Sequence, residues 1–508
     1  MPGLTENLHL LAPEFALAGL AFLVFAVDLF LPEDRKDLLG GLSIVGLLGV
    51  IVLSLVMLPG RQESLYGGLL AVDDFSLFFK IVFLGMGVFI ILSSIEYVKQ
   101  HLTHPGEFYG LVLFSLLGMN LMAQSRELLT AYIALELLSF SLYVLVAYAL
   151  RDPRSNEAAI KYIIIGAFSS AILLYGVSMV YSTLGVTRFA EIAAALMTLD
   201  DVSPALWAGL ALLVVGLGFK LSAAPFHMWA PDTYQGAPLP VTAYLASASK
   251  TAAFALLLRL AAEGLLPATD RWDQWQIILA VLAAVSMLVG NLVALAQRNI
   301  KRLMAYSSIG HVGFILAGVA AISAGSTLAV NGVTFYLVGY AITNMVVFAA
   351  LISYFNMTGH EEISDFAGLA DRQPFLAAAI AIGLFSLAGL PIFVGFTMKF
   401  YLFTAVASAG FLWLAGLAIL ASLISLYYYL QVIRQMYIQP ALAASEAVAG
   451  RHPAEPAAGG APALERPSAL ILTVLVLGLL AVLALGVYPA PLLDLIDASS
   501  RAILPPTP

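Results

Sequence analysis

The stretch from Val214 to Pro240, VVGLGFKLSAAPFHMWAPDTYQGAPLP, begins as an apolar helix and then places a lysine, a proline and a histidine close together. An apolar helix of about 20 residues is long enough to cross a membrane. Within such a helix Lys220 is costly, because a charge in the hydrocarbon region loses its hydration. A charged group beside a helix break at this depth is therefore predicted to serve a function.

The composition of the whole chain indicates a membrane protein. Hydrophobic residues make up 61% of the 508 residues and charged residues only 11%, with a mean hydropathy of +0.96. Soluble domains carry about 25% charged residues. The net charge of −8 is spread over short loops, and no basic region indicates nucleic-acid binding. The chain has no cysteine, which excludes disulfides, thiolate-bound zinc and cysteine-held iron–sulfur clusters.

Apolar runs separated by proline, glycine and charge clusters predict an all-α integral membrane protein with about fourteen transmembrane helices. The run 374–408 is too long for one straight span and contains Pro391. We interpret it as one discontinuous helix, with two re-entrant halves as the alternative. The predicted spans lie near residues 10–31, 38–58, 75–95, 107–124, 127–149, 157–182, 205–230, 239–262, 274–296, 301–323, 327–354, 374–408, 411–437 and 468–488.

Two groups of five spans follow the first three helices and predict an inverted repeat. An odd number of spans makes the second group enter the membrane in the opposite direction, and each group has a proline-broken helix as its fourth member. Transporter sites commonly lie between such repeats, beside discontinuous helices. The predicted divisions are three N-terminal spans in 1–106, the repeats in 107–262 and 274–437, a flexible Ala/Pro linker in 438–467, and a C-terminal span and tail in 468–508.

The basic residues predict the orientation. With the N-terminus outside, twelve lysines and arginines fall in cytoplasmic loops and six on the opposite side. This is the bias that the positive-inside rule describes. Both termini are therefore predicted outside, and the remaining five basic residues are lysines within spans.

Three ionisable residues lie deep within predicted spans. Glu136, in TAYIALELLSFSLYVLVAYA, and Lys220 and Lys250 are far from their span ends, where ionisable groups are functional by default. Burial lowers the pKa of a lysine and a nearby carboxylate raises it, so a moving carboxylate would make a lysine bind and release a proton. A structural ion pair is the alternative for Glu136, and snorkelling fits Lys161 better than the two deeper lysines.

Pro225 is expected to break the helix that carries Lys220 and to free backbone carbonyls near the lysine. Irregular backbone is tolerated in a membrane only where it is buried in protein or lines a water-filled cavity. His227 would either pass protons between Lys220 and Lys250, since imidazole titrates near neutral pH, or cap a helix end.

The second group shows a similar pattern in SLAGLPIFVGFTMKFYLF, where Lys399 follows the Gly389–Pro391 break. His311 is interpreted as a relay group or as a core histidine bonded to a neighbouring serine. Lys80 is interpreted as a snorkelling or locally paired lysine, and Asp28 as interfacial. Neither a phosphate-binding loop nor a set of His and Glu residues at metal-ligand spacing occurs, so no nucleotide, redox or metal site is expected.

Three stretches carry a family resemblance: GLGFKLSAAPFHMWAPDTYQGAPLPVTAYLASASK, NLVALAQRNIKRLMAYSSIGHVGFILAG and SLAGLPIFVGFTMKFYLF. They resemble the antiporter-like membrane subunits of proton-pumping NADH:quinone oxidoreductase (complex I), which are related to subunits of multisubunit cation/proton antiporters. The resemblance spans about residues 107–437 and is greatest to the subunit N type, called subunit 2 in mitochondria. Lys399 stands where the subunit M type carries glutamate, and the long lateral helix of the L type is missing.

The resemblance implies a proton relay in a translocase subunit. NADH, FMN, iron–sulfur clusters and quinone would bind to other subunits, and this chain would hold no cofactor or metal. Its partners would be the lipid bilayer of a bacterial inner membrane and neighbouring subunits of the K, M and J types. The implied relay consists of Glu136 as the modulating glutamate, Lys220 as its partner, Lys250 as the connecting lysine, His227 as a polar relay, Lys399 at the exit and Lys161 on the same polar axis.

Two other hypotheses use the same residues. A multisubunit Na⁺(K⁺)/H⁺ antiporter would need the same lysines, but its activity would not depend on NADH. A structural spacer would use the polar residues only to hold helices together. A relative that takes electrons from another donor, in a photosynthetic or hydrogenase complex, is also compatible with the sequence.

Overall fold

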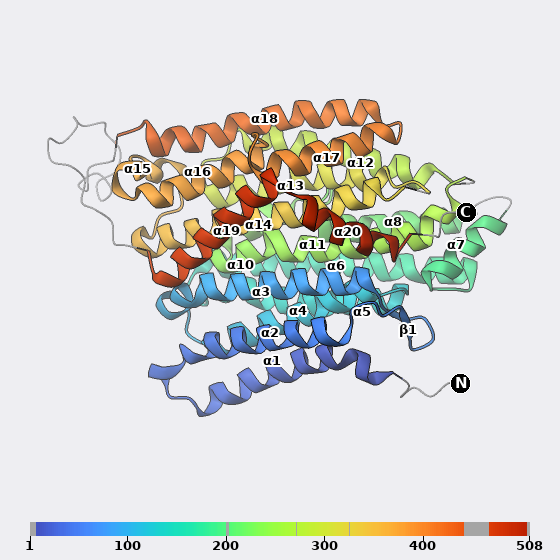
Figure 1. Cartoon of the computed structure of the whole chain (residues 1–508), viewed down its shortest axis with the longest axis horizontal. Coiled ribbons are helices and arrows are strands. Elements are labelled where there is room, and N and C mark those ends of the chain that lie inside the picture. Colours follow the sequence, from blue (N-terminus) through green and yellow to red (C-terminus); the bar gives the residue numbers. More distant parts are fainter. Residues whose placement is uncertain (1–6, 200–202, 271, 325, 441–466, 505–508) are drawn as a thin grey trace.

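The structure is a computed structural model that describes residues 7–199, 203–270, 272–324, 326–440 and 467–504. Its long helices lie side by side along the longest axis of the molecule, and the first and last helices reach the same end of the bundle (Figure 1). Among the described residues, thirteen helices are long and apolar enough to cross a membrane. The chain is therefore a helical membrane protein, as the sequence predicts.

Side-chain caps fix where several of these helices begin. Asp73, Asp152 and Ser203 each accept a hydrogen bond from a backbone N–H of the first turn that has no partner within its helix. The eighth span is interrupted by two π-helical stretches, η3 and η4. The first eight spans are α1 (Ala12–Phe30), α2 (Leu38–Met57), α3 (Asp74–His101), α4 (Pro105–Gln124), α5 (Leu128–Val146), α6 (Pro153–Leu184), α8 (Pro204–Leu221), and the run of α10 (Leu239–Tyr244), η3 (Leu245–Ser249), α11 (Lys250–Arg259), η4 (Leu260–Leu265) and η5 (Leu266–Ala268).

The predicted discontinuous span 374–408 forms two helices of 15 residues each, so it is the one predicted span that no single long helix represents. Gly389 ends the first of them with a φ of +90°, a conformation that favours glycine. The helices of this half are α12 (Gln274–Ala294), α13 (Ile300–Ala320), α14 (Leu328–Thr358), α15 (Leu369–Arg372), α16 (Pro374–Ala388), α17 (Val394–Ser408), α18 (Leu412–Tyr437) and α19 (Ala469–Val487).

The predicted span 205–230 is broken, as Pro225 indicates, but the break begins earlier than expected, because α8 ends at Leu221 and α9 (Trp229–Gly236) follows after a turn. Ser222 adopts a φ of +61° at the end of α8, so the helix stops three residues before Pro225. The Trp229 indole N–H and the Ala223 N–H satisfy the last carbonyls of α8. The break is therefore stabilised by local hydrogen bonds.

Short elements outside the spans were not predicted. The loop before α3 forms a short antiparallel hairpin, β1 (Glu63–Leu65) with β2 (Leu70–Val72), in a chain that is otherwise helical among the described residues. Residues 441–466 of the predicted linker lie outside the described part. The other short elements are α7 (Phe189–Thr198), α20 (Ala490–Arg501), η1 (Leu8–Leu11), η2 (Glu33–Arg35) and η6 (Ile363–Phe366).

The centre of the second half is formed by α13 and α14, which are almost completely buried. Several polar side chains lie in this centre, among them Ser307, Ser308, His311 and Thr343, each at most 1% exposed. Buried polar groups need hydrogen-bond partners. Their hydrogen-bond partners are described below, together with the lysines of this region.

Candidate functional site: a row of buried lysines

Glu136 of α5 and Lys220 of α8 form a loose, partly buried pair. The Lys220 Nζ lies 3.9 Å from the Glu136 carboxylate and donates instead to Ser139 Oγ at 2.6 Å. The Ser170 hydroxyl of α6 donates to Glu136 at 2.5 Å. Ser139 lies three residues after Glu136 on one helix face. Each charged group is therefore hydrogen-bonded to a serine hydroxyl of its own, Lys220 to Ser139 and Glu136 to Ser170, and the two charges lie close without a direct hydrogen bond.

The sequence-based account of the first break is wrong in one respect. The carbonyls at the end of α8 are occupied by Ala223, Ser222 and Trp229 N–H groups, so they do not hold Lys220. The lysine stands in the last turn of α8, where the negative end of the helix dipole favours a cation.

Lys250 begins α11, next to the π-helical stretch η3. Its Nζ donates to Ser308 Oγ of α13 and lies 5.5 Å from the centre of the Tyr234 ring. The Tyr340 hydroxyl of α14 donates to the same serine at 2.8 Å. Among the described residues no carboxylate pairs with Lys250, so hydroxyl and aromatic groups form its surroundings.

His311 continues this polar chain. Its Nδ1 lies 2.7 Å from the Tyr336 hydroxyl and its Nε2 3.4 Å from the Tyr429 hydroxyl, so its partners are tyrosines and not the serine that we expected. The ring also lies 4.8 Å from the Tyr340 ring. Tyrosine and imidazole both donate and accept hydrogen bonds. The chain therefore leads from Lys250 into the second half of the molecule.

Lys399 of α17 occupies the second break. Its Nζ donates to the carbonyls of Leu387 and Ala388 at 2.7 and 3.0 Å and to Ser422 Oγ at 2.8 Å. These carbonyls belong to the last turn of α16, where no helical N–H follows. Free carbonyls that bind a lysine were expected at the first break. The structure shows this arrangement at the second break, around Lys399. Lys399 also lines a mainly apolar cavity of about 670 Å³ between α17 and α18.

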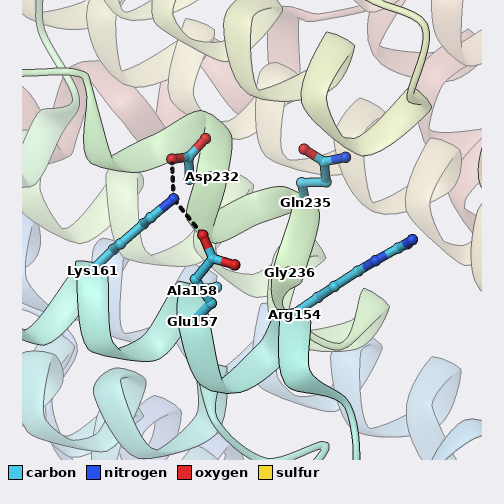
Figure 2. Close-up of a pocket in the computed structure, with 7 residues that line it drawn as sticks. All are labelled: Arg154, Glu157, Ala158, Lys161, Asp232, Gln235 and Gly236. Carbon is cyan, nitrogen blue, oxygen red and sulfur yellow. Dashed lines mark hydrogen bonds and ion pairs between the residues drawn. The ribbon is translucent and has the colours of Figure 1, made fainter.

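Lys161 lies apart from this row. Figure 2 shows it between the carboxylates of Glu157 and Asp232, at distances of 2.8 and 2.9 Å. Arg302 reaches the other oxygen of Asp232 at 2.6 Å. A cavity of about 210 Å³ lies beside these ion pairs. It is lined by Arg154, Glu157, Lys161 and Asp232, together with Ala158, Gln235 and Gly236 (Figure 2).

Asp232 lies on α9, between two spans, and the sequence analysis did not select it. Burial alone would raise the pKa of its carboxyl, but hydrogen bonds from Lys161 and Arg302 outweigh this effect and lower the pKa. The signal was present in the sequence, because the aspartate interrupts the proline-rich turn after Lys220.

His227 is connected to neither lysine. Its ring packs against Tyr306 with the ring centres 6.5 Å apart, and its Nδ1 is buried without a hydrogen-bond partner among the described residues. The structure therefore brings Glu136 close to Lys220, and it brings Lys250 to Ser308 and Tyr340, with His311 packed against the Tyr340 ring. The serines and tyrosines of this row were missed, because hydroxyl residues are common in helices and carry no signal alone.

The ion pairs of the first three spans correct the expectation for Lys80. Lys80 is fully buried and lies 2.6 Å from Glu14 of α1, so it is paired across helices and does not snorkel. Asp28 lies 3.5 Å from Lys36. In the described ranges no group of three or more His, Cys, Asp or Glu side chains could hold a metal ion.

Comparisons with known proteins agree on one family. Residues 125–425 match the family model "NADH:quinone oxidoreductase/Mrp antiporter, TM". The chain is 39% identical over 512 residues to NADH-quinone oxidoreductase subunit N of Desulfitobacterium hafniense, covering 98% of this chain and 99% of that one.

Solved structures give the same fold. A chain of respiratory complex I from Thermus thermophilus is 31% identical with a TM-score of 0.77, covering 96% of this chain and 99% of that chain. A chain of the Mrp complex from Dietzia is 21% identical with a TM-score of 0.82, covering 98% of each, and this likeness shows the fold alone.

Proposed function

The chain belongs to the family of NADH-quinone oxidoreductase subunit N, and from this membership we propose that its row of buried lysines is a proton path. It is a multi-pass subunit of the proton-translocating membrane arm of respiratory complex I. The observation that carries the proposal is the contact of the buried Lys250 with Ser308 of α13 and, through this serine, with Tyr340 of α14, whose ring packs against His311.

Lys220 and Glu136 form the switch of this path. When the two approach, the carboxylate stabilises the ammonium and the lysine holds its proton. When they separate, burial destabilises the ammonium and the proton moves on. The hydroxyl groups of Ser139 and Ser170 support both arrangements, since each can donate or accept.

Lys250 receives the proton and Lys399 releases it. Ser308, Tyr340 and His311 provide donors and acceptors between them, with water filling the remaining gap. Lys161 and Asp232 form a charged entrance beside α6, and His227, which packs against Tyr306, is a further titratable group in the proposed relay. The redox chemistry occurs elsewhere in the complex, so the driving force arrives as a movement or as a change of charge.

The architecture that we propose is an inverted repeat, with divisions at 107–262 and 274–437. It is supported by a helix break near a lysine in each half, at Ser222 for Lys220 and at Gly389 for Lys399. The three spans before the repeats, in 1–106, and the span after them, in 468–508, flank these units. Both ends of the chain face the periplasm, in keeping with the excess of basic residues in the opposite loops.

Subunits of the K, M and J types are the neighbours that we propose, in a bacterial inner membrane. NADH, FMN, iron–sulfur clusters and quinone belong to other subunits, and the path needs no cofactor in this chain. A proton relay requires only groups that bind and release protons in sequence.

Inverted membrane vesicles driven by NADH test this function. Lys220→Ala is expected to reduce acidification strongly at unchanged amounts of complex. Lys99→Ala is the matched control, because this side chain is 63% exposed and pairs only with Asp37 among the described residues. Full acidification by the Lys220 variant would refute the path. Lys220-dependent proton movement driven by a Na⁺ or K⁺ gradient without NADH would favour an antiporter.

A further inference from the structure

The break that holds Lys399 is compressed on its α14 side. The Gly395 N–H and the Thr343 hydroxyl both approach Ser386 Oγ, each at 3.1 Å. A Cβ on Gly395 would lie 1.5 Å from the Ser386 carbonyl oxygen, so only glycine fits there. The start of α17 is therefore pressed against the last turns of α16, the turns whose carbonyls bind Lys399.

The opposite side of the break rests on the end of the last span. The Thr397 hydroxyl of α17 donates to the Gly486 carbonyl of α19 at 2.9 Å. A Cβ on Gly486 would lie 2.1 Å from the Ile392 carbonyl oxygen and 2.6 Å from the Phe393 carbonyl carbon. Ile392 itself has a φ of +82°. The backbone of α19 thus packs directly on the backbone that joins α16 to α17.

The end of α19 is in turn anchored. The helix that follows it, α20, places Asp497 within hydrogen-bond distance of Thr327 and Asn331 of α14, at 2.8 and 2.7 Å. Hydrogen bonds to a charged group are stronger than neutral ones. α14 therefore supports the break directly, through Thr343, and indirectly, through α20 and α19.

We propose that Gly486 and Thr397 are positioning residues for the proton path: the end of α19 holds the break between α16 and α17 in the shape in which two carbonyls bind Lys399. This inference rests on the proposed function of Lys399. It assigns a role to a span, ALILTVLVLGLLAVLALGV, that has no ionisable residue.

The displacement that a side chain at Gly486 would require is larger than the range of a hydrogen-bond length. Ile392 would have to retreat by about 1 Å to accept a Cβ at Gly486, and hydrogen bonds span only about 0.5 Å between their short and long limits. Thr397 lies two residues before Lys399, so a shift of the first turn of α17 moves the ammonium relative to the carbonyls of Leu387 and Ala388. Misplacement by this amount affects catalytic groups strongly.

The test measures protons moved per NADH oxidised by the intact complex in vesicles. Thr397→Val removes the hydroxyl at nearly constant volume, and Thr397→Ser retains it. We expect the valine variant to lower the ratio at least about twofold and the serine variant to restore it, as the loss and return of one hydrogen bond predict. Gly486→Ala is expected to act like valine, with Gly49→Ala as its control, because nothing lies within 4 Å of a Cβ there.

A wild-type ratio for Thr397→Val, or equal losses for the valine and serine variants, would overturn the inference. The threonine pair decides the question if Gly486→Ala does not assemble. Lys399→Ala in the same assay separates the two proposals. Its loss of pumping beside unchanged Thr397 variants would remove only the positioning role, whereas its full pumping would remove the proposed path and the positioning role together.

Discussion

At the residue scale, the lysines within the spans could be selected from the sequence, whereas Asp232 and the hydroxyl groups that contact the lysines could not. Depth within an apolar run identifies Lys220, Lys250 and Lys399, because a charge there is too costly to be incidental. Which hydroxyl each lysine meets depends on how helices rotate and pack, as the contact of Lys250 with Ser308 illustrates. Lys80 was misjudged for the same reason, since its partner Glu14 is distant in sequence.

Ser308→Ala is expected to weaken pumping. The substitution removes the hydroxyl that connects Lys250 with Tyr340 and leaves both without this partner. Loss of one hydrogen bond corresponds to about 0.5–1.5 kcal/mol, a factor of roughly 2 to 10 in rate if it acts in the transition state. NADH-driven acidification measures the effect. Ser182→Ala, on an exposed serine of α6, is the control. Equal rates of acidification for the two variants would argue against a proton path through Ser308.

Asp232→Asn is expected to lower the melting temperature of the subunit in a pH-dependent way. The folded pKa of Asp232 lies below the usual value of about 3.9, so its ion pairs stabilise the fold above that pH. This stabilisation, at most about 1 kcal/mol for a partly exposed pair, is lost as the pH falls through the folded pKa.

The comparison of melting temperatures at pH 7 and at pH values below about 4 checks this sign. The difference between wild type and Asp232→Asn should shrink with falling pH. Asp34→Asn, on an exposed residue without an ion pair among the described residues, should show no such difference. A difference that grows in acid would contradict the assignment.

At the element scale, both helix breaks were predicted from proline and glycine, but their chemistry was not. Pro225 suggested free carbonyls around Lys220, whereas Ser222 ends α8 earlier and nearby N–H groups take these carbonyls. The break at Gly389 leaves its carbonyls to Lys399. A sequence shows where a helix must stop, while the groups that satisfy its end come from other elements. The hairpin was missed because its strands have only three residues each.

A buried ion cluster connects the eighth span to the start of α3 and the end of α4. Arg259 is fully buried and binds both oxygens of Asp73 at 2.8 Å, Glu263 at 2.9 Å and the Ala123 carbonyl at 2.8 Å. Arg259→Met is expected to cost about 3–5 kcal/mol, because it leaves the buried Asp73 carboxylate without its ion pair, whereas Glu263 keeps its pair with Arg126.

Thermal melting of the purified complex, followed through this subunit, measures that cost. The double variant Arg259→Met with Asp73→Asn should be more stable than Arg259→Met alone, since it removes the Asp73 charge that the single substitution leaves unpaired. If the two substitutions destabilise additively, the ion pairs are not coupled and the cluster is not the connection that the geometry indicates.

At the scale of the whole molecule, composition and span count predicted a multi-pass helical membrane protein, and the shared end of the first and last helices fits the predicted parity of spans (Figure 1). Lys250 lies at a contact between helices of the two halves, α11 and α13, whereas the hydrogen-bond partners of Lys220 and Lys399 lie within their own halves. A path that crosses from one half to the other depends on Lys250, because its helix meets α13 and α14 there. No local sequence pattern contains this junction.

Protons moved per NADH oxidised, measured with the purified complex in proteoliposomes, test this central claim most directly when wild type is compared with Lys250→Met. Methionine keeps the apolar stem and removes the ammonium. The account predicts a lower ratio in an intact complex, since one path is interrupted at its junction. A wild-type ratio at full NADH oxidation would contradict it.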